Sequence, residues 1–336
     1  MIDQIAQSAI DNLFGGFWLP LILKVAAVLF VFLTAPLGVG YMEHKVLAHM
    51  QARLGPMEAG RFHGWAQLIA DGVKFIQKED VIPKAADRWT FTLAPAVVLV
   101  PTIMIFIVLP FGQDFFAVNF DLGLFFALAM SSVSVIGIMM AGWSSANKFS
   151  LIGALRAAAQ LIAYELPMIL AAVSIAMLAG TLSLVGISEA QSSYWYVVVQ
   201  PVGFGIFLMA AVAEMTRPPF DMPIADSEII FGAYTEYTGM KFAFLLLTEY
   251  AGIVVWSGIA SVLFLGGYQP LPGMDFIPGW MWMFGKINGL AFFIVWLRAT
   301  YPRLREDQLQ RFSWIGLIPL ALANILVTAV VKVLVK

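Results

Sequence analysis

Two glutamates of this chain lie deep within long apolar segments, where a charge needs a partner, a wet cavity or a function. A carboxylate near the centre of a bilayer costs on the order of 3 kcal/mol even on a lenient insertion scale. Glu165 and Glu249 cannot reach water through lipid, so their positions predict a part in proton relay. Glu43 and Glu214 stand at segment ends, where an interfacial position explains them equally well.

Glu165 has no partner on its own predicted helix. Arg156 precedes it by nine residues, which is about 900° of helix rotation and places the two side chains on opposite faces. We therefore expect Glu165 to face the interior of a helix bundle. Lys24, by contrast, stands near a segment end, where its side chain can extend to the interface and needs no such role.

The segment 215–240 combines charge, prolines and apolar residues. Its charged members are Arg217, Asp221, Asp226, Glu228 and Glu236. Three prolines restrict the path of its backbone. A solvated loop would not need its apolar residues, which are Phe220, Ile224, Ile229, Ile230 and Phe231. The segment is therefore predicted to be an ordered acidic loop that is tucked into protein and leads toward the membrane carboxylates.

The composition places these carboxylates in a membrane. Of the 336 residues, 61% are hydrophobic and 12% are charged, and the mean hydropathy is +0.86, whereas soluble domains carry about 25% charged residues. The formal net charge of -2 supplies no basic face for nucleic acid. Cysteine is absent, which excludes Cys-ligated zinc and Fe–S clusters in this chain. His44, His49 and His63 do not share a helical face, so no metal site is expected.

An all-α polytopic membrane fold, one domain over residues 1–336, follows from the apolar segments, because a spanning helix needs roughly 20 mostly apolar residues. Eight segments qualify: about 17–43, 90–112, 122–143, 157–181, 195–214, 241–267, 279–300 and 313–334. Lys and Arg concentrate in the loop 44–89 and in the other loops on its side, whereas the alternating loops contain none. The positive-inside rule then predicts cytoplasmic large loops and an outside N-terminus.

The first large loop is predicted to contain an amphipathic helix at the membrane surface. Its apolar side consists, at helical spacing, of Trp65, Leu68, Ile69, Gly72, Val73 and Ile76. Its polar side consists of Gln67, Asp71, Lys74 and Lys78. This helix is a passive interfacial element, a wall of a site for a lipophilic molecule, or a platform for a soluble partner, and the pattern does not choose between them.

Five sequence blocks resemble the quinone-site membrane subunit of respiratory complex I, the H subunit of the bacterial NADH:quinone oxidoreductase. The two long signatures are RPPFDMPIADSEIIFG at 217–232 and GWAQLIADGVKFIQKE at 64–79. The shorter blocks, in the family's order, are QARLGP at 51–56, GALRAAAQLIAYE at 153–165 and RATYPRLREDQL at 298–309. The resemblance extends over essentially the whole chain.

The resemblance implies eight transmembrane helices and an outside N-terminus. It also implies that the chain anchors the peripheral arm of the complex, contacts other membrane-arm subunits in the lipid bilayer, and forms part of a tunnel for quinone, the substrate. NADH, FMN and Fe–S clusters are expected in partner subunits, and no cofactor is expected in this chain. The expected location is the inner (plasma) membrane of a bacterium.

The family's functional positions carry over to this chain as two sets. The acidic proton path matches Glu165, Glu214, Asp226, Glu228 and Glu249. The tunnel and its cytoplasmic mouth match Glu43, Arg53, Arg217, Phe220, Asp221, Glu236 and Arg298, with His44 beside Glu43. The chain departs from the family where His44 replaces a usual Arg, Ile224 a usual Glu and Ile315 a common Lys. The change at Ile224 removes one acid from the implied path.

Three other functions compete with this one. A paralogous subunit of an energy-converting membrane hydrogenase shares the fold and the acidic path, but the C-terminal block at 298–309 and the full quinone-type signature argue against it. A proton-coupled transporter is disfavoured because no internal repeat is visible. A purely structural anchor is disfavoured by Glu165 and Glu249.

Overall fold

The structure, a computed structural model, describes residues 18–113, 115–271, 274 and 276–334, and the regular elements among them are helices. Seven helices of this part of the chain have the length and composition of membrane spans. They are α2 (Trp18–Met50), α4 (Arg88–Val108), α5 (Gly123–Ser144), α6 (Lys148–Ala179), α11 (Gly239–Phe264), α12 (Gly279–Thr300) and the run Glu306–Leu334. The predicted all-α polytopic membrane fold is confirmed. The N-terminal tail, which is predicted to lie on the outer side of the membrane, precedes the described residues.

The segment 195–214 is shorter as a helix than the sequence predicts. α8 (Tyr196–Val199) ends before Gln200, and α9 (Pro201–Glu214) begins at a proline, whose missing amide hydrogen suits the first position of a new helix. The 14 residues of α9 make a helix about 21 Å long, which is less than the ~30 Å hydrocarbon core of a bilayer. The run Glu306–Leu334 consists of α13 (Glu306–Arg311), the π-helix η3 (Phe312–Leu317) and α14 (Ile318–Leu334).

Two helices extend further toward the loops than the hydropathy predicts. α6 begins at Lys148 because the Asn147 side chain accepts a hydrogen bond from the Phe149 amide at 2.9 Å. It ends at Ala179, and the next residue, Gly180, has a φ of +76° that suits glycine. α2 continues to Met50, so Glu43 and His44 lie inside the helix and not at its end. These extensions carry polar side chains of both helices to one end of the bundle.

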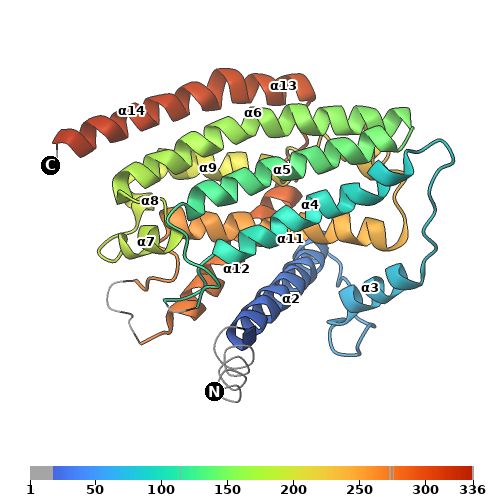
Figure 1. Ribbon diagram of the computed structural model, residues 1–336, viewed down its shortest axis with the longest axis horizontal. Coiled ribbons are helices and arrows are strands. Elements are labelled where there is room, and N and C mark those ends of the chain that lie inside the picture. Colours follow the sequence, from blue (N-terminus) through green and yellow to red (C-terminus); the bar gives the residue numbers. More distant parts are fainter. Residues whose placement is uncertain (1–17, 114, 272–273, 275, 335–336) are drawn as a thin grey trace, which may run out of the picture.

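The helices pack as a bundle in which α4, α5, α6, α9 and α11 run side by side, with α14 along α6 and α2 crossing obliquely (Figure 1). The buried core lies mainly among these helices and α12, and it includes large side chains such as Tyr164, Phe207 and Phe264. Four short elements complete the chain: α3 (Gln67–Gln77), α7 (Leu184–Glu189), α10 (Asp226–Ile229) and η2 (Gly232–Tyr234).

The predicted amphipathic helix of the first loop is α3, which packs beside α2 and α11. Gly40 of α2 allows this contact, because a Cβ there would lie 2.9 Å from Leu68 Cδ1. Ile69, Val73 and Ile76 remain exposed in the structure. Their apolar face is therefore available to lipid or to a lipophilic molecule, which leaves all three predicted uses of α3 open.

Gly153 fixes the distance between α6 and the loop that connects α9 to α11. A Cβ at Gly153 would lie 2.5 Å from Gly232 Cα and 2.7 Å from the Ala233 amide nitrogen. Both neighbours are backbone atoms, which cannot rotate away as a side chain can. The loop therefore lies directly against α6 at this point.

Gly153→Ala should lower the stability of the protein, because overpacking of a tight contact typically costs about 1–3 kcal/mol. Thermal unfolding of the purified protein in detergent measures the effect. Gly205→Ala on α9 is the matched control, because nothing lies within 4 Å of a Cβ at that position. A midpoint for Gly153→Ala equal to that of Gly205→Ala would contradict the close approach.

Candidate functional site

The centre of the candidate site is a buried ion pair between α2 and the loop after α9. Arg217 Nη1 donates to both carboxylate oxygens of Glu43, at 2.9 Å each. The two side chains are only 3% and 2% exposed. Arg298, near the end of α12, donates to the same Glu43 carboxylate and is 38% exposed. A carboxylate that the sequence places at a possible interface is thus enclosed by two cations.

The same arginine reaches α11. Arg217 Nε lies 3.0 Å from Glu249 Oε1, and the Arg217 guanidinium carbon lies 4.7 Å from the centre of the Tyr250 ring. Arginine suits this position because its planar group combines ion pairing with contact to an aromatic face. We call Glu43, Arg217, Glu249 and Arg298 the ion network.

The ion network contains two carboxylates and two guanidinium groups, of which Arg298 is partly exposed. Burial alone would lower the pKa of the Arg217 guanidinium, but the Glu249 and Glu43 carboxylates raise it above its usual value. Arg217 is therefore cationic, and two carboxylates face two guanidinium groups. Removing one member of a buried pair leaves an uncompensated charge, which is far more costly than the net value of the pair.

Gln160 of α6 holds the chain on either side of Arg217. Its Nε2 donates to the carbonyl oxygens of Ala213 and Phe220, at 2.7 Å each. The Phe220 ring packs against the Tyr164 ring with centroids 5.3 Å apart. Phe220 of the predicted acidic loop is therefore buried against α6. Together these contacts fix the backbone on either side of Arg217.

A cavity of about 80 Å³ adjoins the ion network at Glu249. Its lining includes the carboxylates Glu214 and Glu249 and hydroxyl groups from several elements, which are Thr102, Ser131, Ser134, Thr216, Tyr234 and Thr248. A water needs roughly 10–15 Å³ of such space and two to four polar partners, so this cavity can hold several. We call it the acidic cavity.

Glu165 continues the series of acids beyond the cavity. Ser132 of α5 donates a hydrogen bond to the Glu165 carboxylate, and Glu165 lies close enough to Glu214 for the two charges to interact. The expectation that Glu165 faces other helices is thus met by α5. Glu43, Glu249, Glu214 and Glu165 form one series, with Arg217 between the first two.

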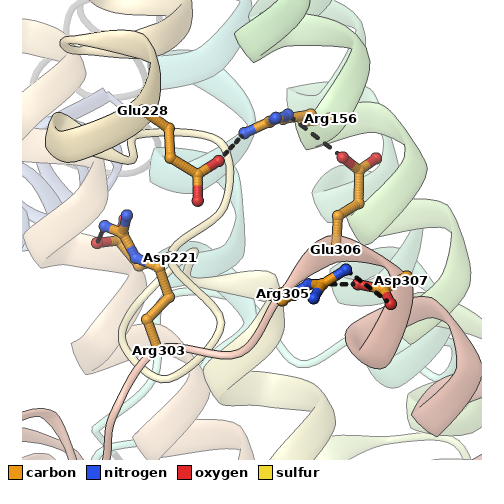
Figure 2. Close-up of polar contacts among 7 residues, drawn as sticks. All are labelled: Arg156, Asp221, Glu228, Arg303, Arg305, Glu306 and Asp307. Atoms are coloured by element: carbon orange, nitrogen blue, oxygen red, sulfur yellow. Dashed lines mark hydrogen bonds and ion pairs between the residues drawn. The ribbon is translucent and has the colours of Figure 1, made fainter.

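Three further loop acids, Asp221, Glu228 and Glu236, are paired at the rim of the site, the first two in Figure 2. Arg156 contacts two acids: its Nη1 lies 2.6 Å from Glu228 Oε2, and its Nε lies 3.3 Å from Glu306 Oε2. Arg303 Nη2 donates to Asp221 Oδ2 at 2.9 Å. Outside the figure, Asn147 Nδ2 donates to Glu236 Oε1 at 2.6 Å. These partners come from α6, from the residue that precedes it and from the chain around α13, so the rim pairs tie the loop to both helices.

Several predicted residues lie apart from the ion network. Arg53 is exposed in the turn after α2, and its Nε donates to Gln51 Oε1 at 2.8 Å. His44 is partly buried, and its Nδ1 has no hydrogen-bond partner in the described chain. The side chain of Asp226 lies outside what the structure describes, although its backbone begins α10. The departures Ile224 and Ile315 are partly buried and exposed, respectively.

Sequence reasoning missed the partners that come from other helices. Gln160, Ser132, Asn147 and Tyr250 each stand on or beside a predicted span, but a single polar residue there carries no pattern that reveals its contact. Arg303 belongs to a resembling block, yet its pairing with Asp221 joins segments 82 residues apart. Periodicity describes one helix at a time, so it cannot assign such pairs.

The fold and the site define a polytopic membrane protein with a series of carboxylates between its helices. The family model for NADH dehydrogenase matches residues 23–329. Relatives named as the H subunit of NADH-quinone oxidoreductase, from Bacillus thuringiensis subsp. konkukian (strain 97-27), Bacillus cereus (strain AH187) and Bacillus anthracis (strain CDC 684 / NRRL 3495), are each 44% identical over 334 residues, which is 99% of both chains. The chain belongs to the NADH dehydrogenase family, which confirms the resemblance found in the sequence.

Arg217→Met should destabilise the protein by about 3–5 kcal/mol, because it leaves Glu43 and Glu249 buried without their shared cation. Thermal unfolding in detergent measures the loss. Arg305→Met is the control, because it removes only an exposed pair with Asp307, worth about 0–1 kcal/mol. Glu43→Gln added to Arg217→Met should recover part of the stability. Equal midpoints for the two single variants would contradict the ion network.

Proposed function

We propose that the chain is the quinone-site membrane subunit of a proton-translocating NADH-quinone oxidoreductase. In this function it forms the membrane part of the quinone tunnel and links quinone reduction to proton transfer through its buried carboxylates. The observation that carries the proposal is the continuous series from Glu43 through Arg217, Glu249 and the acidic cavity to Glu214 and Glu165. The names of its relatives support the quinone and the multisubunit complex.

The ion network lies at the end of the series nearest the predicted tunnel mouth. Reduction of a quinone to a quinol takes two electrons and two protons, so it changes the charge and proton supply near the headgroup. Because the ion network is neutral when its four members are ionised, a charge that appears beside it favours a compensating change of protonation within it. Glu249 is the member that also lines the acidic cavity, so a proton compensating that charge is taken up there.

Water in the acidic cavity then carries the proton onward from Glu249 to Glu214. Most hydroxyl groups of the lining donate to carbonyl oxygens of their own helices, so their oxygens accept hydrogen bonds from these waters. Glu165 receives the proton next, with Ser132 as its fixed hydrogen-bond partner. The chain itself supplies this path, whereas the electrons come from NADH through FMN and Fe–S clusters in partner subunits, since it has no cysteine to ligate a cluster.

The assembly and location follow from the same proposal. The loop that contains α3 contacts the peripheral arm, the helices contact other membrane-arm subunits and lipid, and the large loops face the cytoplasm. The location is the inner (plasma) membrane of a bacterium, which the Bacillus relatives support. The tunnel passes beside α2, α3 and α11, where the exposed apolar residues of α3 suit an isoprenoid tail and the ion network suits a polar headgroup.

Glu249→Gln and Glu165→Gln should each assemble normally but lower coupled quinone reduction and proton pumping by about 100-fold, the lower range of what a positioned acid–base group contributes. Gln keeps the shape of the side chain and removes its ionisation. NADH-driven acidification of inverted membrane vesicles measures pumping. Glu189→Gln, an exposed position on α7, is the control. Wild-type pumping in either assembled variant would exclude that residue from the path.

Lys74→Glu should weaken attachment of the peripheral arm. Lys74 lies on the polar side of α3, is 72% exposed and has only a 3.5 Å contact with Asp71. The measurement is the amount of arm that co-purifies as salt is raised, because added salt screens surface charges. Lys84→Glu, an exposed lysine of the same loop outside α3, is the control. Release of the arm at the same salt concentration in both variants would argue against docking on α3.

A further inference from the structure

Tyr234 lines two separate cavities. One is the acidic cavity, with Glu214 and Glu249 in its wall. The other is a hollow of about 270 Å³ between the end of α3, the loop before α11 and the start of α11, which we call the outer hollow. Its lining includes Phe75, Lys78, Tyr234, Tyr237, Thr238 and Phe242. Tyr234 is the residue that the two linings share.

The outer hollow opens at the end of the bundle where the predicted cytoplasmic loops lie. Lys78, at its edge, is exposed to solvent. The Thr238 hydroxyl accepts from the Val81 amide at 3.0 Å and donates to the Glu79 carbonyl oxygen at 3.2 Å, which holds the loop after α3 against the start of α11. The hollow is therefore walled mainly by aromatic side chains, with Lys78 and Thr238 among its polar groups, and the exposed Lys78 shows that its edge is reached by water.

The acidic cavity has an unsatisfied acid in its wall. Within the described chain, Glu214 Oε2 is buried and has no hydrogen-bond partner. A buried oxygen of this kind takes up water or a proton, because leaving its hydrogen bonds unmade costs the full desolvation of the group. Glu214 Oε2 therefore needs a water or a proton from the acidic cavity, and the ion network borders that cavity only at Glu249.

The backbone that carries Tyr234 is fixed. η2 is held against α6 by the close approach of Gly153 and Gly232, and the Tyr234 amide donates to the Phe231 carbonyl oxygen at 3.2 Å. Burial raises the pKa of the Tyr234 phenol, and the charge of Glu249 raises it further. The phenol is therefore neutral, and a neutral hydroxyl both donates and accepts a hydrogen bond.

We propose that the Tyr234 hydroxyl is a relay group through which protons enter the acidic cavity from the outer hollow. This inference rests on the proposed function, because it supplies the acidic path with a second entrance beside the ion network. In each transfer the hydroxyl oxygen accepts a proton from protonated water in the outer hollow, and its own proton passes through water in the acidic cavity to the Glu214 carboxylate. One O–H bond forms as another breaks, so the Tyr234 phenol is neutral before and after the transfer. Rotation of its O–H bond then prepares the hydroxyl for the next proton.

The test uses the assembled complex in inverted membrane vesicles with NADH as the electron donor. Tyr234→Phe should lower proton pumping about tenfold, the rate equivalent of one lost hydrogen bond, and should raise the solvent deuterium isotope effect as proton uptake becomes limiting. Tyr234→His restores a group that can pass a proton and should recover part of the rate. Tyr237→Phe is the matched control, because this tyrosine lines only the outer hollow and its hydroxyl donates to the Phe91 carbonyl oxygen.

The outcomes separate relay from packing. A Tyr234→Phe complex that pumps at the wild-type rate with an unchanged isotope effect would overturn the proposal. So would a Phe variant that fails to assemble, or a His variant no faster than Phe, because either result makes Tyr234 a packing residue. Normal pumping in Tyr234→Phe together with loss in Glu249→Gln would reject the second entrance and leave the proposed function intact. Normal pumping in both Glu249→Gln and Glu165→Gln would instead reject the acidic path itself.

Discussion

The position of Arg217 between Glu43 and Glu249 is the interaction on which the rest of the site depends. It joins α2 to α11 through a residue that belongs to neither helix, and Arg298 adds α12. Four charges that sum to zero are tolerable among apolar helices, whereas an unbalanced set of three is not. The same balance makes the site sensitive to added charge. A proton or a nearby anion unbalances the four charges, and the interior accommodates an unbalanced set only at a higher free energy.

Much of the architecture could be predicted from apolar segments and charge spacing alone. Seven of the eight predicted segments correspond to helices of spanning length in the described chain, and α3 lies where the apolar and polar residues alternate with helical spacing. Glu165 and Glu249 stand out in the sequence because a carboxylate within an apolar membrane segment is costly in free energy. These properties depend on neighbours within one helix, which is the range over which sequence patterns are informative.

The remaining features depend on contacts between distant segments. The fifth predicted segment is largely apolar, but its helix is interrupted at Gln200. This residue belongs to neither α8 nor α9, and α9 begins at the proline that follows it. The extension of α2 to Met50 moves Glu43 from a possible interface into a buried position. Glu43 pairs with a residue 174 positions away. Hydropathy gives equal weight to the interfacial and functional interpretations of Glu43, and it contains no sign of this pairing.

α6 presents one face to most of the site. Gly153, Arg156, Gln160 and Tyr164 follow one another at three- and four-residue intervals and contact, in turn, η2, the rim acids, the backbone beside Arg217 and the Leu309 carbonyl oxygen. Insertion or deletion of a single residue within α6 would rotate everything beyond it by about 100° and would separate these contacts all at once. The length of this helix between Gly153 and Tyr164 is therefore constrained more strictly than the identity of its lipid-facing residues.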